Sequence, residues 1–195
     1  MALRCRCVAL AVLAGMLLAV PVAVADSGAY IADVHLSEGS AGDLILGFRV
    51  QQAMDQRVID TLESGLAVRF TYWVRVQHPR QVVPDEKLVD LRFERVLEKD
   101  NLKDRYRLTM EEGHPPRDVA NLEEAVGLMG LVEGVSLLPM EVLDSRRPLY
   151  LRIRVRLQRF EMPFRLHYVL PFVSYLDVGT DWYSLELPPA SVVRQ

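Results

Sequence analysis

The sequence predicts a mainly β or α+β fold: a single antiparallel β-sandwich-like domain with two short helices. Residues 66–77 and 149–158 alternate apolar and polar side chains, which is typical of strands with one buried face. Two shorter segments, 53–63 and 118–129, instead repeat apolar residues at helical spacing. No Gly/Ser-rich linker or shift in composition divides the chain, so we expect one domain.

The amino-terminal 25 residues have the layout of a secretory signal peptide. Two arginines precede an apolar run, which ends in the small-residue sequence Ala23-Val24-Ala25. Cleavage there would release residues 26–195 as a periplasmic domain. The alternative is an uncleaved anchor in the inner membrane, because the apolar run reaches the lower limit of a membrane span. Contact with the membrane is expected only in that second case.

Charge and cysteine content narrow the function classes. The 195 residues carry 23 basic and 26 acidic side chains, a net charge of −3, and loss of two leader arginines makes the mature charge −5. A chain with this charge has no electrostatic support for nucleic-acid binding. Both cysteines, Cys5 and Cys7, lie in the leader, so the mature chain is cysteine-free and has neither disulfides nor a thiol nucleophile.

The strand assignments follow the alternation. In residues 66–77 the even positions face inward, and in residues 149–158 the odd positions do. A slip of one residue in the second strand would bury three arginines, so its register should be strongly fixed. Shorter strands are expected at residues 30–36, 43–50, 135–140 and 182–187.

Residues 88–110 predict a hairpin with a four-residue tip at residues 99–102. Hydrophobic pairs on one face and opposite charges on the other make the assignment self-consistent. The predicted partners are Glu98 with Lys103, Glu94 with Arg107, Phe93 with Leu108, and Leu91 with Met110.

Each predicted helix has one apolar stripe. In residues 53–63 the stripe comprises Met54, Val58 and Leu62, and Gly65 follows as a terminator. The second helix spans residues 118–129, with Asp118 as its N-cap. Its inward residues are Val119, Leu122, Val126 and Met129.

Motifs for catalysis, cofactors and metals are not found. The four histidines, at positions 35, 78, 114 and 167, lack metal-ligand spacing. No phosphate-binding loop, dinucleotide fingerprint or Gly-x-Ser-x-Gly elbow occurs, and Ser174 has no base beside it in sequence. We therefore predict no catalytic, cofactor-binding or metal-binding residue and expect a protein that is not an enzyme.

Contact chemistry is more evident than catalytic chemistry. The candidate interaction residues are Trp73, Arg152, Arg154, Arg156, Asp177, Asp181 and Trp182. The three arginines could meet an anionic ligand or a lipid headgroup, but a solvated face paired with glutamates of neighbouring strands is the favoured interpretation. The two aspartates could bind a cation or form an acid/base pair, but a turn stabilised by backbone hydrogen bonds is favoured.

The carboxyl-terminal block resembles the DUF4390 family of exported bacterial proteins of unknown function. The resemblance rests on Pro171-Phe172-Val173-Ser174, Asp177 and Thr180-Asp181-Trp182-Tyr183. It implies a periplasmic or membrane-attached protein of a Gram-negative bacterium. The family's genes often neighbour a membrane histidine kinase, which implies an envelope or signalling role, but it offers no functional residue to carry over.

Two functions are expected from these observations. The first is a non-enzymatic periplasmic accessory or interaction module with a protein partner in the cell envelope. The second is a small-ligand-binding or sensor-input domain, in which the aromatic and aspartate block would line a pocket. Ligand, pathway and oligomeric state are not encoded in any motif.

Overall fold

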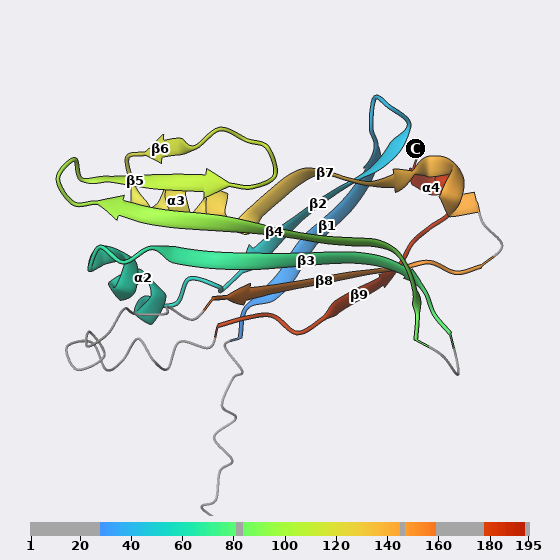
Figure 1. The fold of residues 1–195 in the computed structure, drawn as a ribbon, viewed down its shortest axis with the longest axis horizontal. Helices are drawn as coiled ribbons and strands as arrows, with labels where there is room; N and C mark the ends of the chain where they lie inside the picture. Colours follow the sequence, from blue (N-terminus) through green and yellow to red (C-terminus); the bar gives the residue numbers. More distant parts are fainter. Residues whose placement is uncertain (1–27, 81–83, 145–146, 159–177, 194–195) are drawn as a thin grey trace, which may run out of the picture.

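The computed structural model describes residues 28–80, 84–144, 147–158 and 178–193, which form two antiparallel sheets stacked face to face. In Figure 1 the smaller sheet crosses behind the larger one. The smaller sheet has the order β1-β2-β7, with β1 at Tyr30–Glu38, β2 at Asp43–Gln51 and β7 at Leu131–Pro139. The predicted antiparallel, sandwich-like fold is confirmed.

The larger sheet has six strands in the order β6-β5-β4-β3-β8-β9. The two strands that alternation predicted, β3 and β8, are neighbours in this sheet and pair with each other. The strands are β3 (Val68–His78), β4 (Glu86–Asp100), β5 (Arg105–Met110), β6 (Arg117–Val119), β8 (Tyr150–Leu157) and β9 (Tyr183–Glu186).

The core lies between the sheets, and strand alternation determines which side chains enter it. From β3 and β8 the predicted inward residues are buried, including Phe70, Tyr72 and Ile153. Phe48 of β2 faces them, with its ring centroid 6.4 Å from that of Tyr72. Because the inward row is apolar, the polar row of β3 and β8 must stand on the outer face of the larger sheet.

The β4–β5 hairpin forms, but the predicted register is wrong. Leu108 pairs with Leu97 rather than Phe93, and the tip occupies residues 101–104 rather than 99–102. The Asp100 carboxylate accepts hydrogen bonds from the backbone N–H groups of Leu102 and Lys103, at 3.0 and 3.2 Å. This local turn chemistry fixes the tip two residues later than expected.

Both predicted helices form but begin later than expected. Helix α2 spans Gln56–Glu63 and is capped by Asp55, so Met54 precedes it. Helix α3 spans Leu122–Gly130 and is capped by Asn121. Asp118 is therefore not the N-cap: with Val119 it lies in β6, and its carboxylate pairs with Arg107 at 3.0 Å.

Two short helices complete the described part of the chain. The 3-10 helix η1 at Met140–Asp144 follows β7, and α4 at Ala190–Val193 follows β9. Of the described helices, none combines the length and apolar character needed to cross a bilayer.

A buried arginine holds α3 on the inner face of the larger sheet. The Arg95 side chain is 2% exposed and pairs with Glu112 at 2.6 Å. It also donates to the main-chain carbonyls of Leu128 at 2.8 Å and Leu131 at 2.5 Å. The Leu128 carbonyl lies in the last turn of α3 and the Leu131 carbonyl at its C-cap, and this last turn has no basic residue of its own. Arg95 therefore supplies the positive charge that a helix carboxyl terminus favours.

Candidate functional site

Most of the candidate interaction residues lie together on the outer face of the larger sheet. The strand register sets three rows across β4, β3 and β8. The middle row is Arg92, Trp73 and Arg154, and extending the β8–β9 register by one residue adds Trp182 beside Arg154. The flanking rows are Glu94, Thr71 and Arg156 on one side, and Asp90, Arg75 and Arg152 on the other. We call the following set the arginine–tryptophan face: Trp73, Arg75, Arg92, Arg152, Arg154, Arg156 and Trp182.

Trp182 is placed by the segment that leads into β9. Buried Thr180 bonds twice with Val155 of β8: its N–H donates to the carbonyl at 2.8 Å, and its hydroxyl accepts from the amide at 3.0 Å. Gly179 allows this close approach, because a Cβ there would lie 2.9 Å from Arg156 Cγ and 3.1 Å from the Val155 carbonyl. The segment is thereby fixed against β8, which positions the indole that follows it.

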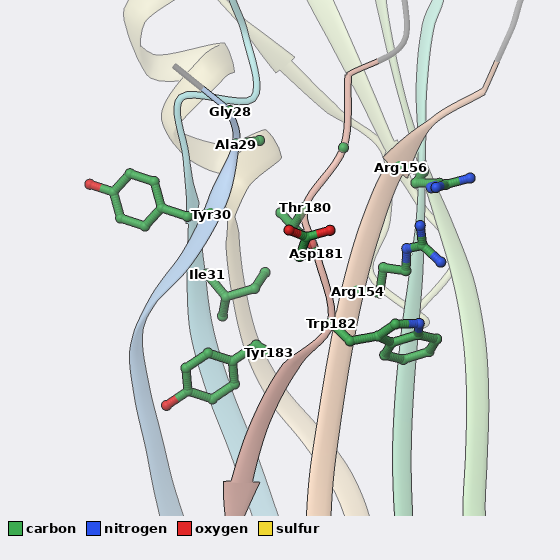
Figure 2. Close-up of a pocket in the computed structure, with 11 residues that line it drawn as sticks. Gly28, Ala29, Tyr30, Ile31, Arg154, Arg156, Thr180, Asp181, Trp182 and Tyr183 are labelled. Atoms are coloured by element: carbon green, nitrogen blue, oxygen red, sulfur yellow. The ribbon is translucent and has the colours of Figure 1, made fainter. Parts of the chain in front are cut away.

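The indole of Trp182 gathers three guanidinium groups. The Cζ atoms of Arg75, Arg152 and Arg154 lie 4.8, 5.0 and 5.6 Å from its ring centroid. Figure 2 shows the Arg154, Arg156 and Trp182 side chains on one side of β8. Trp73 has a similar neighbour, Arg92, at 5.9 Å. Each contact is a cation–π interaction, which orients a guanidinium plane without neutralising its charge.

Two arginines of the face stand directly opposite each other. Arg75 of β3 is the cross-strand partner of Arg152 of β8. Like charges in this position destabilise a sheet. Here the cost is reduced because both groups contact Trp182, and Arg75 also pairs with Asp90 at 2.7 Å. An arrangement that breaks a packing rule in this way is more typical of a functional surface than of a purely structural one.

The two carboxylates in these rows, Glu94 and Asp90, already accept hydrogen bonds from basic side chains of the protein. Glu94 accepts from Arg69 and Arg92 at 2.9 Å each and from Gln158 at 2.6 Å. Burial works to raise the pKa of Glu94, but the hydrogen bonds from the two arginines hold that pKa below its ordinary value. Hydrogen bonds from Lys87 and Arg75 likewise lower the pKa of Asp90, against the opposing effect of burial.

The arginines of β8 are not matched in this way. Within the described ranges, no ion pair joins Arg152, Arg154 or Arg156 to a carboxylate. The buried Nε of Arg154 also has no hydrogen-bond partner there. The sequence favoured pairing of these arginines with glutamates of neighbouring strands. The described residues show no such pairs, and Arg152 and Arg154 contact Trp182 instead.

A cavity of about 630 Å³ opens beside the same strands. As Figure 2 shows, it lies where the start of β1 approaches the end of β8 and the segment before β9. Its polar lining residues include Tyr30, Arg154, Arg156 and Asp181. Asp177 lies outside the described residues, so the structure tests neither the favoured turn at Asp177 and Asp181 nor the alternative cation site or acid/base pair.

Comparison with known proteins identifies the family. The sequence profile described as "Domain of unknown function (DUF4390)" matches residues 26–186, most of the chain. The chain belongs to the DUF4390 family. This confirms the resemblance seen in the carboxyl-terminal block. No curated protein and no solved structure matches the chain.

Two members of the arginine–tryptophan face of this DUF4390 protein were not among the predicted site residues. Arg75 lies on β3, which alternation predicted, and Arg92 lies on β4, which was predicted as one arm of the hairpin. The importance of both residues depends on which residues they face across the sheet. The predicted Trp73, Arg152, Arg154, Arg156 and Trp182 are brought together. Both tryptophans are half-buried rather than fully exposed.

The described histidines of the DUF4390 chain are separate from this face. His78 is buried, and its Nδ1 lies 2.9 Å from the Pro148 carbonyl, a structural contact. His35 Nδ1 lies 3.0 Å from the carbonyl of Asp33. Among the residues that the structure describes, no group of three His, Cys, Asp or Glu side chains is arranged to bind a metal ion. His167 and Ser174 lie outside those residues.

Proposed function

We propose that this DUF4390 protein is a non-enzymatic interaction module of the cell envelope, which binds a protein partner through the arginine–tryptophan face. One observation carries the proposal: Arg152, Arg154 and Arg156 stand in a row without a carboxylate partner in the described chain, beside an ordered indole.

The composition of the face supports a protein partner. Tryptophan and arginine are, with tyrosine, the residues enriched among those that dominate binding energy at protein interfaces. Stacking on Trp182 restrains the guanidinium groups before a partner arrives, so less side-chain entropy is lost on binding. A surface prepared in this way favours binding over a purely solubilising role.

The compartment is part of the proposal. The signal-like residues 1–25 and the export implied by the family support a periplasmic location. An amino-terminal anchor in the inner membrane is the alternative form of the same proposal. In both forms the partner belongs to the envelope, and the proposed link to an envelope signalling system follows from the family resemblance.

Site-specific photocrosslinking in living cells tests the function. A photoreactive phenylalanine derivative would be placed at position 92 on the face and, as a control, at position 117. Arg117 is opposite buried Leu108, so it projects from the other side of the sheet. We expect a defined crosslinked species from position 92 that weakens in the Trp182→Ala variant. Equal crosslinking from both positions, or from neither, would contradict the proposed function.

The cavity beside β8 favours a second candidate function, the binding of a small anionic ligand. Its volume of about 630 Å³ is in the range of small-molecule sites, and Arg154 and Arg156 line it. A ligand at about 100 times its Kd would stabilise the protein by about 2.7 kcal/mol, which raises the melting temperature. A panel of metabolite anions tests this function, and a melting temperature unchanged by every class would argue against it.

A further inference from the structure

We infer that the arginine–tryptophan face recognises an extended, acidic polypeptide segment of its partner. The inference rests on the proposed function, because it specifies the chemistry of the partner. It is carried by the spacing, the charge and the donor geometry of the β8 arginines.

The spacing of the arginines fits an extended chain. Arg152, Arg154 and Arg156 project from one face of β8 at alternate positions. Alternate residues of a strand are about 6.7 Å apart along its axis. An extended peptide that runs along β8 presents its own alternate side chains at the same interval. Aspartate or glutamate at every second position would therefore meet successive arginines.

The charge of the face favours an acidic segment. The three rows across β4, β3 and β8 contain five arginines and two carboxylates, which leaves three positive charges in excess. Both carboxylates already accept hydrogen bonds from the protein itself. Added carboxylates would also relieve the repulsion between Arg75 and Arg152, so binding would remove an unfavourable interaction as well as add favourable ones.

The donors suit carboxylates in particular. A guanidinium offers a planar pair of N–H groups, which a carboxylate accepts in a bidentate manner. Contact with Trp182 restrains the Arg152 and Arg154 guanidinium groups. A guanidinium group that is already restrained needs little rearrangement to bind a carboxylate.

The charge of the whole chain distinguishes a peptide from an anionic bilayer. The protein carries a net charge of −3, so a broad anionic surface would repel most of the molecule. A narrow peptide experiences only the local positive field, since solution charges beyond about 10 Å are screened at 0.1 M salt. The positive face on an acidic protein therefore favours a slender acidic ligand.

Fluorescence anisotropy with defined peptides tests the inference. The probe is a labelled peptide of about 12 residues that alternates glutamate and serine, so that its carboxylates repeat at the β8 interval. A peptide of the same composition with its glutamates in one block controls for spacing, and an alternating lysine–serine peptide controls for sign. Vesicles that contain phosphatidylglycerol, with and without the protein, test the lipid alternative.

The matched variants are Arg152→Gln/Arg154→Gln on the face and Arg117→Gln on the opposite side of the sheet. We expect the alternating acidic peptide to bind best and more weakly as salt rises from about 0.05 to about 0.5 M. The face variant should lose at least about tenfold in affinity, or about 1.4 kcal/mol, while Arg117→Gln should bind as wild type does. Urea unfolding of each variant confirms that the fold is retained.

Several outcomes would overturn the inference. They are equal binding of the face variant, equal binding of the blocked peptide, or recruitment to vesicles without peptide binding. Crosslinking from position 92 shows whether only the inference of an acidic segment fails or the proposed function fails as well. If the crosslink persists while the acidic peptide does not bind, the acidic segment is wrong and the interaction module stands; if both are lost, both proposals fail.

Discussion

Replacing Arg95 with methionine tests how the larger sheet holds α3. The substitution keeps much of the side-chain volume but removes the pair with Glu112, in which the two side chains are 2% and 10% exposed. It also removes donors to the carbonyls of Leu128 and Leu131. Removing one member of a buried ion pair costs about 3–5 kcal/mol, because the other charge stays buried. Here Glu112 Oε2 already lacks a hydrogen-bond partner, so Glu112 has no alternative donor within the described structure.

Urea unfolding followed by circular dichroism measures the effect. A loss of about 3–5 kcal/mol is a large part of the 5–15 kcal/mol that is roughly typical of a folded domain. The control is Arg107→Met, which breaks an ion pair of 3.0 Å whose two side chains are about half exposed, and this variant should lose much less stability. Adding Glu112→Leu to Arg95→Met should recover much of the loss. Equal losses in the Arg95 and Arg107 variants would refute the reasoning.

Three further changes test other parts of the fold. Asp55→Ala removes the cap that accepts from the Val58 amide at 3.0 Å and should cost about 1 kcal/mol in urea unfolding; an unchanged midpoint would show that the cap is dispensable. Gly65→Ala should cost about 1 kcal/mol or more, because φ is +87° and the new Cβ would approach Asn101 Nδ2 at 2.8 Å; a stabilised variant would contradict this backbone geometry. Glu94 has a lowered folded-state pKa, so its stabilising contribution is present above its ordinary value of about 4.5 and is lost as pH falls through the folded value. Glu94→Gln should therefore lose less stability than wild type as the pH falls below about 4.5, and parallel profiles would refute the assignment.

Alternation predicted β3 and β8 well for a physical reason. A slip of one residue would turn the apolar row outward and bury Arg152, Arg154 and Arg156, so only one arrangement of faces is stable. Their neighbours in space, and hence the importance of Arg75 and Arg92, could not be predicted, because strand order is not written in local sequence.

The hairpin register failed because the competing arrangement keeps the same faces. Pairing Leu108 with Leu97 instead of Phe93 is an even shift, which leaves these three residues on the inner face. Turn chemistry at Asp100 and the left-handed backbone of Asp104, with φ of 49°, decided between the two. Likewise Asp118 and Asn121 are both good N-caps, and pairing of β6 with β5 selected the second.

The position of β3 between β4 and β8 sets an order for folding. Thr71 meets Glu94 across 23 residues of sequence but Gln158 across 87. Closing the longer loop costs about 1 kcal/mol more in chain entropy, so the β3–β4 pairing should form before β8 joins. Until then β3 is an unpaired edge strand, and its apolar row of Phe70, Tyr72 and Val74 lacks its cross-strand neighbours from β8. A chain that ends before β8 should therefore aggregate rather than fold, which makes the last quarter of the sequence the step that completes the domain.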